Sequence, residues 1–97
     1  QGYMGKYLVQ LSLKALQDLK DIKKSGRKSD LKKIQELLLE IEEEPRKGLG
    51  LPEHLKYFKN REVWSRRLNQ KNRLVYEIFE TDTLIVVIQA LGHYSDK

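Results

Sequence analysis

The sequence predicts an α+β fold, in which an N-terminal strand and a helical hairpin pack on one face of a mainly antiparallel twisted sheet. Apolar residues recur at spacings of three and four between residues 12 and 45, which is typical of amphipathic helices. After residue 45 this period stops, and short runs rich in β-branched and aromatic residues follow. The connections between these runs are short, so neighbouring strands are expected to be antiparallel.

The first predicted element is a short strand over residues 6–11, in which apolar and polar side chains alternate. Ser12 follows it and is positioned to cap a helix that runs to about residue 24. This helix is expected to stop at Ser25-Gly26, because glycine readily adopts the left-handed conformation that closes a helix. Its apolar stripe consists of Ala15, Leu16, Leu19 and Ile22.

A second helix is expected to be capped by Ser29 or Asp30 and to end at Pro45. Its apolar stripe consists of Leu31, Ile34, Leu37, Leu38 and Ile41. Two helices joined by a short turn form a hairpin that can cover one face of a sheet. The acidic run over residues 40–44 is interpreted as a solvated helix end.

Four further strands are predicted, over residues 55–59, 63–68, 73–79 and 84–91. The run over residues 84–88 is apolar on both faces and is expected to lie centrally in the sheet. The sheet face opposite the helices is expected to remain available for a ligand. Alternating apolar residues of the middle strands, Trp64, Leu74, Tyr76 and Ile78, are assigned to the core.

The 97 residues suffice for one domain with a modest core. Gln1-Gly2 resembles a protease-cleavage remnant and Met4 a native start, so residues 1–3 are expected to precede a single domain over residues 4–97. The longest apolar run, residues 84–88, is far too short to cross a bilayer, and no apolar leader follows the N-terminus. The chain has no cysteine, which favours a reducing cytoplasm.

Positive charge is concentrated in one part of the chain. The net charge is +5 overall, and residues 45–79 hold nine Lys or Arg against three acidic residues, which gives that segment +6. Such segregation favours a polyanionic partner, above all nucleic acid, bound through its phosphates. On charge alone, a lysine-rich solubilising surface is an equally good interpretation.

The sequence has no zinc-ligand spacing, no phosphate-binding loop, no dinucleotide-binding glycine pattern and no paired-carboxylate metal motif. We therefore expect neither a metal nor a cofactor. Metal-free cleavage of RNA needs a base for the 2′-hydroxyl, an acid for the leaving 5′-oxygen and fixed cations around the phosphate. Glu, His, Arg and Lys residues in the basic segment and at the C-terminus can fill these roles.

Four motifs occur in order along the chain: Gly48–Lys56, Trp64–Arg67, Asn72–Tyr76 and Gly92–Tyr94. In order and spacing they resemble the YoeB/Txe toxins of the RelE/ParE superfamily over nearly the whole chain. The resemblance implies a RelE-like, microbial-ribonuclease-like fold and the toxin of a type II toxin–antitoxin system. It further implies an endoribonuclease that cuts mRNA on the ribosome, a neutralising antitoxin of YefM/Phd type, and the option of a homodimer.

The resemblance also implies roles for individual residues. Glu53 would be the general base toward the 2′-hydroxyl. His93 would be the general acid, and Tyr94 would orient the phosphate or stack on a base. The cations that would bind the scissile phosphate and stabilise its developing charge are Lys56, Arg67 and Arg73.

Several points stay open at the level of sequence. Strand alternation places Arg66 on the face opposite Arg67, where we expect a solvated charge. Arg67 and Arg73 share a face only if an odd number of residues connects their strands. Two rival functions remain: a ParE-like toxin that poisons DNA gyrase without acid–base residues, and a basic nucleic-acid-binding module without catalysis.

Overall fold

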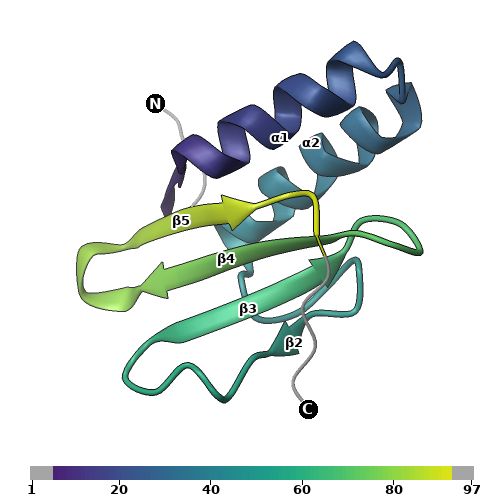
Figure 1. Cartoon of the computed structure of the whole chain (residues 1–97). Helices are drawn as coiled ribbons and strands as arrows, with labels where there is room; N and C mark the ends of the chain where they lie inside the picture. Colours follow the sequence, from purple (N-terminus) through teal and green to yellow (C-terminus); the bar gives the residue numbers. More distant parts are fainter. Residues whose placement is uncertain (1–5, 93–97) are drawn as a thin grey trace.

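A computed structural model describes residues 6–92 of the protein. The elements are β1 (Leu8–Leu11), α1 (Leu13–Lys24), α2 (Lys28–Glu43), β2 (Glu53–His54), β3 (Glu62–Arg67), β4 (Arg73–Phe79), the 3-10 turn η1 (Glu80–Asp82) and β5 (Leu84–Gln89). The five strands form one sheet in the order β1-β5-β4-β3-β2, and Figure 1 shows both helices on one side of it. Only β1 and β5 pair in parallel, and the other pairs are antiparallel. The predicted α+β class is confirmed.

The main core lies between the helical hairpin and the sheet. Buried side chains of α1 and α2, including Ile22, Leu37 and Ile41, pack against alternate residues of β4 and β5. The predicted core residues are confirmed, with Leu74, Tyr76 and Ile78 buried and Trp64 packed half-buried against the cluster. Within the described chain, neither helix is both long and apolar enough to traverse a lipid bilayer.

Ser12 connects the start of α1 to the sheet. Its Oγ accepts a hydrogen bond from the Ala15 N–H at 3.1 Å, as predicted for a cap, and donates to the Ile88 carbonyl at 2.8 Å. One hydroxyl therefore satisfies an otherwise unpaired amide of the first helical turn and holds that turn against β5.

The start of α2 differs from the prediction. The helix begins at Lys28 after Arg27, which makes no side-chain cap, so neither Ser29 nor Asp30 is the cap. Asp30 lies in the first turn instead, where a carboxylate is favoured by the helix dipole. It accepts a hydrogen bond from the Asn69 amide at 3.1 Å and so connects α2 to the β3–β4 loop.

The strand predicted over residues 55–59 is wrong, because β2 ends at His54 and turns follow it. Leu55 and Phe58 both pack on the second sheet face, in a small cluster with Val63 and Val75. In a strand, residues three apart point to opposite faces, so only a turn can bring both onto one face. This turn partly covers the face that the sequence predicted to be open for a ligand.

Candidate functional site

Arg67 and Arg73 lie directly opposite each other on neighbouring strands, β3 and β4. The connecting segment is residues 68–72, an odd number, so both side chains lie on the sheet face away from the helices. Like charges in this arrangement repel each other and destabilise a sheet. Their pairing therefore calls for an explanation other than stability.

The remaining four of the six arginines form ion pairs with carboxylates: Arg27, Arg46, Arg61 and Arg66. Neither Arg67 nor Arg73 has such a partner within residues 6–92. Two arginines without carboxylate partners, held side by side on rigid strands, are suited to binding an external anion.

The two arginines open onto a cavity of about 540 Å³ at this end of the sheet. Its lining consists of Lys33, Gly50, Leu51, Arg67, Leu68, Asn69, Gln70 and Arg73. It thus brings together three cations, from α2, β3 and β4, with no carboxylate among the lining residues. We call this set the cationic cavity. Its volume lies in the range typical of small-ligand sites, and its chemistry is that of a phosphate site.

Gly50 forms one wall of the cationic cavity and cannot be replaced without strain. Its φ is +80°, and its carbonyl accepts a hydrogen bond from the Arg67 N–H at 2.6 Å. A Cβ at this position would lie 3.0 Å from the Arg67 carbonyl oxygen. Glycine is therefore required both for the left-handed backbone and for the close approach to β3.

Arg66 corrects the sequence prediction, because it is fully buried rather than solvated. It does lie on the face opposite Arg67, but that face packs against the end of α2. Its guanidinium donates to Tyr76 Oη at 3.0 Å and to the carboxylate of Glu40. It also donates to three carbonyls of the segment that leads to Gly50, namely Glu44, Lys47 and Leu49. Arg66 thereby holds the loop that walls the cationic cavity.

Glu40 is likewise not part of a purely solvated helix end. Besides accepting from Arg66, its carboxylate accepts a hydrogen bond from the Leu49 N–H at 2.6 Å. The end of α2 and the glycine-containing loop are therefore joined through one carboxylate, which the sequence prediction for residues 40–44 missed.

Glu53 is exposed and lies opposite Ser65, two residues along β3 from Arg67. Residues two apart on a strand share a face, so the carboxylate lies on the same face as both arginines, diagonally from Arg67. It does not line the cationic cavity. The structure thus places the predicted base beside the cationic cavity and outside it.

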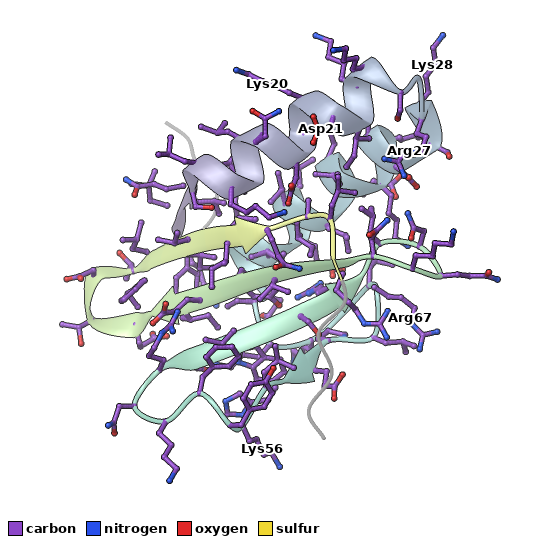
Figure 2. The ribbon with its side chains drawn as sticks, in the orientation of Figure 1. Lys20, Asp21, Arg27, Lys28, Lys56 and Arg67 are labelled. Atoms are coloured by element: carbon purple, nitrogen blue, oxygen red, sulfur yellow. The ribbon has the colours of Figure 1, made fainter. Side chains whose placement is uncertain are left out.

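Lys56, the third cation predicted to bind the phosphate, lies outside the cationic cavity. It is exposed in the turn that follows β2 and is not among the residues that line the cavity. Figure 2 shows Lys56 below β2 and Arg67 near the end of β3, so the two cations do not converge.

The predicted strand over residues 84–91 ends earlier, at Gln89, and the two residues that follow it bond to Asp18 instead of to a strand. The buried Asp18 carboxylate accepts from the Ala90 and Leu91 N–H groups at 2.9 and 3.0 Å and pairs with Lys14 at 2.6 Å. Burial raises the pKa of Asp18, but the Lys14 ammonium and the two N–H groups outweigh it, and the pKa is lowered.

The described chain ends beside Arg73. The Gly92 carbonyl accepts from the Arg73 N–H at 2.8 Å, and the Gly92 N–H donates to Asn72 Oδ1 at 3.0 Å. The predicted acid His93 and its neighbour Tyr94 follow in the sequence and lie outside the described residues. Between residues 6 and 92, no cluster of three or more His, Asp or Glu side chains could hold a metal ion.

Lys33 is the member of the cationic cavity that sequence reasoning missed. It stands four residues before Leu37 and seven before Glu40, so the three share one stripe of α2. Leu37 is buried and approaches Gly50, while Glu40 holds the loop. The sequence signal for Lys33 was therefore this spacing, which places it one turn before Leu37 on the stripe of α2 that faces the glycine-containing loop.

Residues 11–94 match the family model described as the YoeB-like toxin of bacterial type II toxin–antitoxin systems, which spans most of the chain. The chain belongs to this YoeB toxin family. Toxin YoeB of Streptomyces coelicolor is 43% identical over 63 residues, which cover 65% of this chain and 71% of the relative. The family resemblance found in the sequence is confirmed.

Solved YoeB structures share the fold. The YoeB dimer from Staphylococcus aureus superposes with a TM-score of 0.78 at 32% identity, over 92% of this chain and 99% of that one. A YoeB-YefM complex from the same organism gives a TM-score of 0.72 at 31% identity, over 91% and 98% of the two chains. All site residues predicted from the sequence fall within the range that matches the YoeB family.

Proposed function

We propose that this YoeB-family toxin is an mRNA endoribonuclease that acts on the ribosome without a metal. The observation that carries the proposal is the pair of facing arginines without carboxylate partners among residues 6–92, which open onto the cationic cavity. A repulsive pair is tolerable if an anion bound between the two cations offsets the repulsion. The anion proposed is the scissile phosphate of RNA.

In this mechanism Glu53 removes the proton from the 2′-hydroxyl, and the resulting oxygen attacks the adjacent phosphorus. A 2′,3′-cyclic phosphate forms as the bond to the 5′-oxygen breaks, and His93 gives that oxygen its proton. Arg73 and Arg67 stabilise the negative charge that grows on the phosphate oxygens. Tyr94 orients the phosphate, and Lys56 binds the RNA backbone beyond the cavity, near the turn after β2.

An antitoxin of YefM/Phd type is the proposed partner, because a related YoeB is found in complex with YefM. An acidic segment of such a partner would cover the basic segment, residues 45–79, and so hinder RNA binding. A homodimer is proposed on the same basis, from the YoeB dimer of S. aureus. The proposed site of action is the bacterial cytoplasm, where translating ribosomes are found.

The test is to incubate purified protein with mRNA, with and without ribosomes, and to map the 5′ ends of the products. We expect discrete cuts in the presence of ribosomes and a large loss of cutting in Glu53→Gln. Glu36→Gln is the matched control, since Glu36 is an exposed carboxylate on α2 that does not line the cationic cavity. Intact mRNA after incubation with ribosomes and folded protein would overturn the proposal.

A further inference from the structure

Lys33 has surroundings that set it apart from the other lysines of α2. It is half-buried and lines the cationic cavity, whereas the adjacent Lys32 is exposed and does not. It lies one turn before Leu37, whose side chain approaches Gly50, and so lines the cavity from the side of α2. An ammonium group held near two guanidinium groups is repelled by both, so a bound anion would stabilise the arrangement.

The rest of the cavity lining fits a nucleotide better than a bare anion. Leu51 is 67% exposed with φ of +50°, an unfavourable backbone conformation for a leucine, and it presents an apolar surface beside the cations. Gln70 is exposed and makes no side-chain hydrogen bond to any other residue of the described chain. Its neighbour Asn69 is committed to the turn and to Asp30.

We infer that the cationic cavity is a subsite for one nucleotide of single-stranded RNA next to the scissile phosphate, with Lys33 as a further phosphate-binding residue. The inference rests on the proposed function. Arg67 and Arg73 border the cavity and share the face of Glu53, so a strand cut beside Glu53 continues into it. Leu51 contacts the base, and Gln70 bonds its edge, in the manner by which proteins bind unstacked RNA bases.

RNA is favoured over an acidic peptide as occupant because the cavity combines cations with the apolar surface of Leu51 and the exposed amide of Gln70. A carboxylate side chain would use only the cations. A phosphodiester-linked nucleotide uses all three kinds of group, since its phosphate, its ring face and its base edge are chemically distinct.

The experiment measures binding of a short 2′-O-methyl RNA oligonucleotide by fluorescence anisotropy over a range of salt concentrations. This RNA cannot be cut by 2′-hydroxyl attack, so the readout is independent of cleavage. For Lys33→Gln we expect a roughly tenfold weaker affinity at low salt, as for loss of a hydrogen bond to a charged group. The plot of log affinity against log salt concentration should become less steep by about 0.7, the value for one phosphate contact to a single strand.

Lys32→Gln is the matched control and should change neither the affinity nor the slope by a comparable amount. Gln70→Ala should weaken binding to the RNA and leave binding to an abasic oligonucleotide unchanged. Both lysine variants are checked for unchanged thermal unfolding. Equal affinities and slopes for Lys33→Gln and Lys32→Gln would overturn the subsite.

A glutamate-rich peptide serves as the second probe. If it binds as tightly as the RNA and with the same dependence on Lys33, the cavity is a peptide site and the inference fails. Failure of the proposed function is distinct from this. A protein that binds RNA through Lys33 but never cuts mRNA on ribosomes retains the subsite and loses the nuclease assignment.

Discussion

Arg66 and Arg67 are adjacent residues of β3 with opposite surroundings. Arg66 is fully buried and donates five hydrogen bonds, to Tyr76, to Glu40 and to three backbone carbonyls. Arg67 is exposed, has no carboxylate partner in the described chain and faces Arg73. One step along the strand thus separates an arginine that holds the fold from one that is free to bind a ligand.

The difference teaches that charge in this sequence has two uses that composition cannot separate. On the helix side, protein acceptors take the place of the water that would otherwise solvate the Arg66 guanidinium, and these hydrogen bonds make a buried cation tolerable. On the other side, Arg67 and Arg73 repel each other and have no carboxylate partner among residues 6–92. Substitutions on the two sides should therefore affect different measurements.

The largest effect is expected for Arg66→Met. This change leaves three loop carbonyls without the Arg66 donor and leaves Glu40 with the Leu49 N–H, and breaking an ion pair with a fully buried member typically costs about 3–5 kcal/mol. The free energy of unfolding in urea should fall accordingly, whereas Arg67→Met should change it by less than about 1 kcal/mol. Similar losses for the two variants would contradict the assignment of Arg66 to the fold.

The next effect concerns the other face of the sheet. Arg73→Ala should lower the single-turnover rate of mRNA cleavage by about 10² to 10³, the usual cost of one transition-state donor, with the fold intact. Lys71→Ala is the control, since Lys71 is an exposed cation in the same hairpin and does not line the cationic cavity. An unchanged rate in folded Arg73→Ala protein would remove Arg73 from the site.

Much of the fold followed from the sequence, because periodicity and turn chemistry are local. The helical hairpin, the Ser12 cap and the antiparallel β3–β4–β5 pairing came from patterns within about fifteen residues. The strand over 55–59 failed because its apolar residues pack through a turn, and only contact with Val63 and Val75 reveals this. Burial by distant segments overrides local propensity.

The site was less predictable, because it depends on register and on long-range acceptors. The sequence could place Arg66 and Arg67 on opposite faces but could not show that carbonyls more than fifteen residues away surround Arg66. Nor could it show that Lys33 joins arginines from two strands. The family match extends to His93 and Tyr94, whose roles stay predictions.

A smaller effect is expected at Asp18, which is a buried acidic residue in the same way that Arg66 is a buried basic residue. Asp18→Asn weakens the acceptor for the Ala90 and Leu91 N–H groups and the pair with Lys14, which should lower the free energy of unfolding by about 1–3 kcal/mol. Because the pKa of Asp18 is lowered in the folded state, this stabilisation is present above the unfolded pKa of about 3.9.

The stabilisation by Asp18 is lost as the pH falls through the lower folded pKa. The difference in unfolding free energy between wild type and Asp18→Asn should therefore be constant near neutrality and shrink below about pH 4. Urea unfolding at a series of pH values measures it. A difference that stays constant down to pH 2 would show that the carboxylate charge contributes nothing.

The smallest effect has the opposite sign and concerns Arg67 itself. Arg67→Gln removes one member of a facing like-charge pair, so the free energy of unfolding should rise by about 0.2–1 kcal/mol at low salt. The gain should vanish near 1 M salt, where the screening length falls to about 3 Å. Inorganic phosphate should also reduce this gain in stability, because an anion bound between the arginines stabilises the wild type alone.

The variant Arg73→Gln and the double variant with both substitutions complete a double-mutant cycle. Because the two arginines repel each other, each single substitution should raise the free energy of unfolding, and the double variant should gain less than the sum of the two. A loss of stability in Arg67→Gln that is insensitive to salt and phosphate would mean that Arg67, like Arg66, serves the fold.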